Sequence, residues 1–139
     1  MSNNQSFSES RELQIPLAVL RISTAFFLTV WALDKILGAE RAMQTVSKYY
    51  LSVDSPAIIL SAGIIQLIIV ALFAAGIFKT LTYGAVLAMH TVSVLASIPR
   101  YLDPLARPNI LFWAAIPVLA GMILLFTLRR YDRFLSLGK

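Results

Sequence analysis

The sequence predicts an all-α integral membrane protein, a four-helix bundle with a short amphipathic interfacial helix between its first and second spans. Hydrophobic residues make up 58% of the chain and charged residues only 14%, whereas soluble domains average about half and about a quarter. The 139 residues also contain four apolar stretches close to the roughly 20 residues that a helix needs to cross a bilayer. We expect one membrane domain over residues 16–139, preceded by a polar segment over residues 1–15.

The first predicted span covers residues 16–38. Pro16 suits a first helical turn, where its missing N–H needs no partner, and Gly38 suits a C-terminal cap. Arg21 lies about one turn inside, from where its long side chain can reach the headgroups. The preceding segment lacks the basic start of a secretory signal, and the apolar run ends without a cleavage pattern, so we expect a retained anchor.

Residues 40–53 place apolar side chains on one face at helical spacing, which favours a helix lying along the membrane surface. A lid over the end of the bundle is the alternative. A second span over residues 57–78 follows, because Asp54 can cap a helix and Pro56 suits its first turn. Gln66 is its one strongly polar side chain.

The third predicted span covers residues 81–99 and the fourth covers residues 109–128. Only a tight turn at Lys79-Thr80 separates the second and third spans, so they should be antiparallel neighbours. In the fourth span, we expect Asn109 to cap the helix and Pro117 to kink it, because proline cannot donate a backbone hydrogen bond.

The basic residues are divided between the two predicted ends of the bundle. One end collects Arg11, Lys79, Arg129, Arg130, Arg133 and Lys139, with Arg21 close by, and the other holds Lys35, Arg41, Lys48, Arg100 and Arg107. Positive residues favour the cytoplasmic side of a membrane. We therefore expect a multi-pass protein of the bacterial-type cytoplasmic (inner) membrane with both termini in the cytoplasm.

The third span carries the only histidine of the chain. At 3.6 residues per turn, Tyr83, His90, Ser97 and Tyr101 share a narrow arc of one helix face, with Ser93 beside it. Lipid offers polar groups no hydrogen bonds, so we expect this stripe to point into the bundle.

Two further sets of residues complete the candidate ligand-binding site. Gln66 should lie at the depth of His90 on the neighbouring span, where the two side chains either satisfy each other or hold a ligand. Near the outer end, Asp34, Lys35, Arg100 and Asp103 could gather with Tyr101 around the mouth of the bundle. Solvated helix ends and salt bridges are the simpler explanation for each of these charges taken singly.

Several kinds of chemistry are excluded by composition. The chain has no cysteine and one histidine, so it cannot attach c-type haem covalently, ligate an iron–sulfur cluster through cysteine or supply paired histidines to b-type haem. We predict no metal site and no covalently bound cofactor. The net charge of +5 comes from residues that flank apolar spans, which indicates contact with a lipid bilayer and not with nucleic acid.

Short motifs along nearly the whole chain, as far as Asp132, resemble those of DoxX-type membrane proteins. They are Trp31 to Lys35, Phe78-Lys79-Thr80 with Tyr83-Gly84, His90 followed by Ser93, Tyr101 to Pro104, and the stretch from Pro108 to Phe112. The resemblance implies a four-helix membrane bundle. The best-described relatives, DoxD-like large subunits of thiosulfate:quinone oxidoreductase, imply electron transfer from a sulfur compound to quinone, but this sequence is most similar to members without assigned activity.

Two functions are compatible with these observations. In the first, the protein is a quinone-linked membrane oxidoreductase or part of one: His90 and Tyr101 bind the quinone ring, and Lys35 and Arg100 attract an anionic donor or a periplasmic partner subunit. In the second, it is a non-enzymatic accessory or scaffold subunit that packs against a larger complex through the small residues Gly84 and Ala88. Transport is a weaker third possibility, because four helices leave little room for it unless the protein forms a homo-oligomer.

Overall fold

Four long helices run alongside one another in the computed structural model, which describes residues 11–50 and 52–138. The long helices are α2 (Arg11–Leu37), α4 (Pro56–Ala74), α5 (Lys79–Ala96) and α7 (Ala115–Leu128). The shorter elements are α3 (Ala39–Tyr49), α6 (Ile98–Tyr101) and the 3-10 helix η1 (Asn109–Ala114). The described part of the chain contains no strand, so the prediction of an all-α fold is confirmed there. Residues 1–10 of the predicted polar segment lie outside the described residues.

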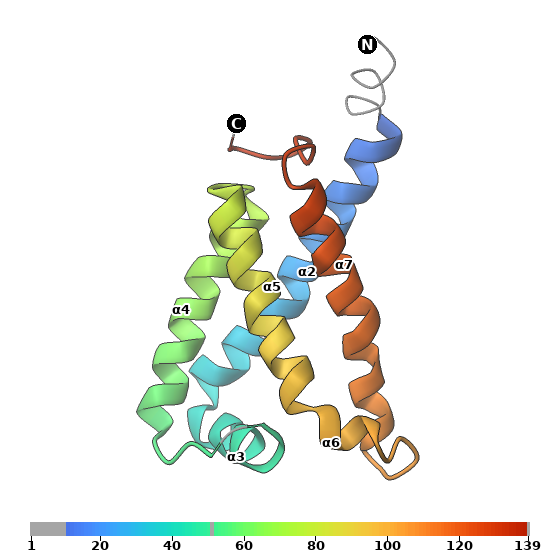
Figure 1. The fold of residues 1–139 in the computed structure, drawn as a ribbon. Helices are drawn as coiled ribbons and strands as arrows, with labels where there is room; N and C mark the ends of the chain where they lie inside the picture. Colours follow the sequence, from blue (N-terminus) through green and yellow to red (C-terminus); the bar gives the residue numbers. More distant parts are fainter. Residues whose placement is uncertain (1–10, 51, 139) are drawn as a thin grey trace.

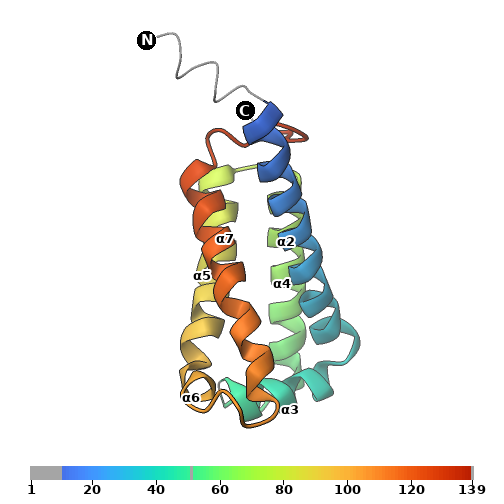
Figure 2. The ribbon, with the colours of Figure 1, turned by 90° about the vertical axis from the view of Figure 1, so that its right-hand side faces the viewer.

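The long helices pack in pairs, α2 along α4 and α5 along α7, and α4 also contacts α5 (Figures 1 and 2). The start of α2, the α4–α5 turn and the end of α7 meet at one end of the molecule, here named the terminal end. At the opposite end, α3 runs across the direction of the long helices (Figures 1 and 2).

Three helical stretches are long and apolar enough to cross a membrane: Arg11–Leu37, Pro56–Ala74 and Asn109–Leu128. They correspond to the first, second and fourth predicted spans. Many large apolar side chains on them face outward, among them Phe26, Ile58 and Leu111. This surface is what a lipid-facing protein requires. The 18-residue helix α5 runs beside these three stretches but is not one of them.

The first helix begins earlier than its proline suggested. Helix α2 already includes Arg11, so Pro16 lies in its interior and not in the first turn. Its ring nitrogen cannot donate to the carbonyl of Glu12, one turn back. The predicted end is confirmed, since α2 stops at Leu37, directly before Gly38.

The connection between α4 and α5 is a glycine-capped turn over residues 75–78. Gly76 adopts a left-handed conformation with φ +68°, its N–H bonds the carbonyl of Phe73 and the N–H of Ile77 bonds that of Leu72. This pair of bonds is the Schellman motif that ends many helices. The second and third helices are antiparallel neighbours as predicted, although Lys79 already belongs to α5.

The last long helical stretch changes its winding along its length. It starts as the 3-10 helix η1 and becomes α-helical at Ala115, so Pro117 is the third residue of α7 and not a kink within a uniform helix. Asn109 is buried, and its side-chain amide donates to the carbonyl of Asp103 at 2.9 Å. Asn109 therefore anchors the preceding loop. The prediction that it caps the helix is wrong, because the N-cap residue is Pro108 and no side chain bonds the helix start.

Candidate functional site

The predicted polar stripe faces the interior of the molecule, but its helix ends at Ala96, so Ser97 follows α5 and Tyr101 belongs to α6. Tyr83 is 1% exposed, His90 6% and Ser97 2%, while Ser93 and Tyr101 are half-buried. The stripe does not surround one shared space, however. Tyr83 packs edge-on against Phe73, with ring centroids 4.8 Å apart, inside the main hydrophobic cluster.

His90 connects two helices. Its Nε2 atom lies 3.0 Å from the carbonyl oxygen of Ala115, at the junction of η1 and α7. The ring also meets the edge of Phe27 from α2, with centroids 5.9 Å apart. A histidine with these neighbours acts as a hydrogen-bonded packing residue between α5 and α7.

Gln66 does not pair with His90, so the predicted contact between them is wrong. Its Nε2 donates to the carbonyl of Leu28 at 2.9 Å, and its Oε1 accepts a bond from the Lys35 ammonium at 3.1 Å. Helix α4 packs along α2, and Gln66 faces that helix. The predicted depth of Gln66 in the membrane did not specify which neighbouring helix its side chain would face. Gln66 and Lys35 therefore hold α2 against α4.

The predicted charged mouth separates into local pairs. Asp34 accepts a bond from Arg41 at 2.8 Å, and the Arg100 guanidinium donates to the carbonyl of Lys48 at 3.3 Å. Asp103 contributes its backbone carbonyl to Asn109. Among residues 11–50 and 52–138, no hydrogen bond, ion pair or ring contact joins Asp34 or Lys35 to Arg100 or Tyr101.

Hydroxyl groups do gather where α5 ends. The Ser97 hydroxyl donates to the carbonyl of Ser93 at 2.8 Å and also interacts with the phenol of Tyr50, from the end of α3. Tyr101 is close enough to Tyr50 for their charges to interact. Burial raises the pKa of Tyr50, the Ser97 hydrogen bond lowers it and Tyr101 raises it. The balance keeps the Tyr50 phenol protonated and able to donate.

Aromatic rings enclose these hydroxyls. Tyr101 meets Trp113 edge-on at 5.6 Å, and Phe112 lies 5.6 Å from Tyr49 and 6.3 Å from Tyr50 between ring centroids. We name the set Tyr49, Tyr50, Ser97, Tyr101, Phe112 and Trp113 the hydroxyl–aromatic cluster. The Arg100 guanidinium lies over the Tyr49 ring at 5.1 Å. The site is thus built by α3 and its C-cap, the residue between α5 and α6, α6 and η1.

One atom of this cluster is unsatisfied. The Tyr101 hydroxyl is buried and has no hydrogen-bond partner among the described residues. Burying a hydroxyl without a partner costs about 1–3 kcal/mol, so such groups are rare unless a ligand or water completes them. This makes the hydroxyl–aromatic cluster the strongest candidate site among the predicted residues.

A second polar centre at the terminal end was missed by the sequence analysis. Arg21 and Asp132 form an ion pair at 2.6 Å with no exposure of either side chain, so Arg21 does not reach the headgroups as predicted. Tyr83 donates to the other carboxylate oxygen at 2.7 Å. The available signal was a single acid within a basic C-terminal stretch and a single arginine within the predicted span over residues 16–38.

The residues around Asp132 fold back over the terminal end. Gln14 donates to the carbonyl of Tyr131 at 2.6 Å, and Lys79 donates to the backbone carbonyl of Asp132 at 2.8 Å. Farther along, the N–H of Leu137 donates to the carbonyl of Ala75 at 2.8 Å in the α4–α5 turn. We name residues 129–138 the C-terminal strap, because they connect α2, the turn and α5.

The small-residue face proposed for partner contacts is partly occupied within the chain. A Cβ atom placed on Gly84 would lie 3.3 Å from the Phe126 ring of α7, whereas Ala88 is exposed. Gly84 therefore serves the packing of α5 against α7, and only Ala88 is available to a partner.

The described residues contain no group of three or more His, Cys, Asp or Glu side chains placed to hold a metal ion. Comparisons of the chain with protein-family models, with curated proteins and with solved structures found no match.

Proposed function

We propose that the protein is a DoxX-like, quinone-binding protein of the bacterial-type cytoplasmic membrane and that it belongs to a membrane redox system. The single observation that carries the binding role is the buried, partnerless hydroxyl of Tyr101 beside Ser97 and Tyr50. A quinone carbonyl is an acceptor that this phenol could satisfy. The flat aromatic side chains around it suit a planar ring, because offset stacked and edge-on arrangements of rings are favourable.

The membrane placement rests on several features together. Three helical stretches are long and apolar enough to cross a bilayer, and α5 lies beside them with its polar face buried. This arrangement supports four spans, with α3 along the outer surface. The larger number of basic residues at the terminal end supports a cytoplasmic location for both termini.

The ring is held at the end of α5 and not at His90. His90 lies in α5 and Tyr101 in α6, eleven positions later, so the two side chains do not belong to one continuous helix. We therefore assign the ring to Tyr101 alone, whereas the sequence predicted that both side chains bind it. His90 is instead occupied by the Ala115 carbonyl.

Reduction of a quinone to a quinol takes two electrons and two protons. The electrons would come from a sulfur compound, as in the thiosulfate-oxidising relatives of the DoxX-like family, or from a periplasmic partner subunit. Arg100, half-buried beside Tyr49 at the outer end, would attract such an anionic donor. Tyr50 and Tyr101 are the hydroxyls nearest to the proposed ring.

The test compares quinone content and stability in the same variants. The protein is purified in lipid nanodiscs, its quinone is extracted and quantified, and its thermal unfolding is followed. We expect Tyr101→Phe to lose quinone. In quinone-free nanodiscs its stability should equal or exceed that of the wild type, because the change removes a hydroxyl that has no partner without the ligand. Tyr49→Phe, the same chemical change on the same cluster, is the control and should retain quinone.

His90→Gln should also retain quinone, since the glutamine amide can donate to the Ala115 carbonyl. If the wild-type protein binds no quinone even after excess quinone is added to the nanodiscs, the proposal is contradicted. The accessory-subunit alternative would then remain. Equal losses in Tyr101→Phe and Tyr49→Phe would contradict the assigned role of Tyr101.

A further inference from the structure

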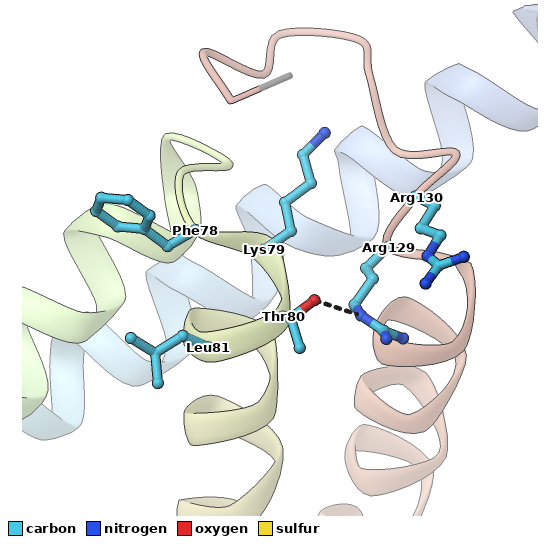
Figure 3. Close-up of a pocket in the computed structure, with 6 residues that line it drawn as sticks. All are labelled: Phe78, Lys79, Thr80, Leu81, Arg129 and Arg130. Atoms are coloured by element: carbon cyan, nitrogen blue, oxygen red, sulfur yellow. Dashed lines mark hydrogen bonds between the residues drawn. The ribbon is translucent and has the colours of Figure 1, made fainter.

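A hollow of about 500 Å³ opens between the start of α5 and the end of α7, at the terminal end of the molecule. Its lining consists of Phe78, Lys79, Thr80, Leu81, Arg129 and Arg130 (Figure 3). Three of these six residues are cations and none is an acid. The hollow lies away from the hydroxyl–aromatic cluster, which is at the opposite end.

One guanidinium is fixed at the edge of the hollow. Arg129 donates from Nε to the Thr80 hydroxyl at 3.2 Å and from Nη1 to the carbonyl of Phe126 at 2.6 Å. It also lies over the Phe126 ring, 4.2 Å from the centroid. These contacts use two of its five N–H donors. The remaining donors are held in position, and no carboxylate among the described residues pairs with this guanidinium.

A second guanidinium comes from the next residue. Arg130 is exposed, and it makes no hydrogen bond or ion pair within the described residues. Figure 3 shows its guanidinium on the same side of the chain as that of Arg129, whereas the Lys79 side chain points away from both guanidinium groups. The Lys79 ammonium is occupied there by the backbone carbonyl of Asp132. The two arginines are therefore the cations available to a ligand.

Apolar side chains form the other wall. Phe78 is 69% exposed and Leu81 is 72% exposed, and both lie on the α5 side of the hollow, across from the arginines (Figure 3). Two arginines beside an exposed apolar wall, at the end of apolar helices, match a molecule with an anionic head and an apolar tail. Arginine binds phosphate through two parallel hydrogen bonds, which fixes its geometry as well as its charge.

We propose that this hollow binds an anionic glycerophospholipid of the cytoplasmic leaflet, with Arg129 and Arg130 on its phosphate and Phe78 and Leu81 against its acyl chain. The inference rests on the membrane placement proposed above and is independent of quinone binding. A wild-type protein that retains quinone but does not bind the lipid would refute only this site. A wild-type protein that binds the lipid but retains no quinone would refute only the quinone site.

General attraction between basic residues and an anionic membrane surface has to be separated from a defined site. Arg133 provides a matched control, because it is an exposed arginine of the same strap outside the hollow. Its backbone N–H bonds Gln14, and the substitution Arg133→Gln leaves that bond unchanged. Arg133→Gln removes the same charge from the same end as Arg129→Gln or Arg130→Gln.

The experiment measures lipid binding to delipidated full-length protein by native mass spectrometry, with phosphatidylglycerol and phosphatidylcholine as probes. We expect phosphatidylglycerol to bind in preference to phosphatidylcholine, and the Arg129→Gln/Arg130→Gln variant to bind it about tenfold more weakly or worse. Leu81→Ser should weaken lipid binding as well. If Arg129→Gln lowers stability, Arg130→Gln alone serves, because the exposed Arg130 side chain makes no hydrogen bond or ion pair with the described residues.

Three results would overturn the proposal. An equal loss in Arg133→Gln would show unspecific attraction. Equal binding of the two lipids would show that the anionic charge of the headgroup is not recognised. Displacement of the lipid by inorganic phosphate, with Leu81→Ser unaffected, would show a site for free phosphate.

Discussion

The guanidinium of Arg21 lies 2.6 Å from the carboxylate of Asp132, and neither side chain is exposed. These residues are 111 positions apart, so the pair connects the first helix with the strap that follows the last one. Arg21 also donates to the carbonyls of Phe134 and Leu135 at 2.9 and 2.7 Å. A buried charge is stable only when its partner and its hydrogen bonds are present.

Breaking this pair should destabilise the whole molecule. Asp132→Ala leaves the Arg21 charge buried without its counterion, and we expect a loss of about 3–5 kcal/mol in the free energy of unfolding. The measurement is reversible unfolding of the full chain in mixed detergent micelles. Arg133→Gln, one residue along and exposed, is the control and should change stability by less than about 0.5 kcal/mol. Similar losses in both variants would contradict the role assigned to the pair.

Tyr83→Phe tests the second oxygen of the same carboxylate. The substitution removes only the hydroxyl that donates to Asp132 at 2.7 Å and keeps the ring packed against Phe73. Hydrogen bonds to charged groups contribute about 1.5–3 kcal/mol, so we expect a loss in that range by the same unfolding assay. The effect should largely disappear in an Asp132→Ala background, because the acceptor is then absent. Full additivity would contradict the bond.

Two glycines should respond oppositely to alanine. A Cβ on Gly63 would lie 2.8 Å from the Lys35 Cβ and 3.1 Å from the Ala32 carbonyl oxygen, so Gly63→Ala must push α4 away from α2. We expect a loss of about 1–3 kcal/mol. A Cβ on Gly84 meets only the Phe126 ring, at 3.3 Å.

For Gly84→Ala we expect little change or a gain of up to about 1 kcal/mol, because alanine favours helix and the ring can shift. Thermal unfolding of both variants checks the order. A Gly84→Ala variant that is less stable than Gly63→Ala would show that the tightest helix contact lies between α5 and α7.

Gln66→Met should loosen α2 from α4 while preserving side-chain volume. The change leaves the Lys35 ammonium without its side-chain acceptor and the Leu28 carbonyl without the amide donor. We expect a loss of about 1–3 kcal/mol, measured by unfolding, and faster hydrogen exchange around Leu28. His90→Gln should leave exchange at Leu28 unchanged. Faster hydrogen exchange at Leu28 in the His90→Gln variant would contradict this assignment and would indicate a contact between Gln66 and His90.

Hydrophobic periodicity and the residues that start and stop helices predicted most of the helices well. Gly38 ends α2 where expected, Pro56 begins α4, and the buried face of α5 follows from the spacing of Tyr83, His90 and Ser97. Pro16 and Pro117 were poorer guides. A proline limits only its own backbone bond, and the neighbouring turns can absorb that loss by continued α-helix or by 3-10 winding.

The candidate site was predictable only in part. The predicted stripe contains Ser97 and Tyr101, but Tyr50 joins them from the C-cap of α3 and Trp113 from η1. No periodicity within one helix shows which ring of another helix will lie beside it. The same reason separates Gln66 from His90, because equal depth does not specify which neighbour a side chain faces.

The sequence by itself determined the helical class, the apolar stretches and the inward face of α5, because each depends on residues close together along one helix. Only the tertiary structure decided that Arg21 meets Asp132 and that Gln66 meets Lys35. It also decided that the Tyr101 hydroxyl is buried without a hydrogen-bond partner among the described residues. Such pairings depend on the rotation and the relative height of packed helices. Those two quantities arise from the packing of all the side chains together and are not encoded in any single stretch of the chain.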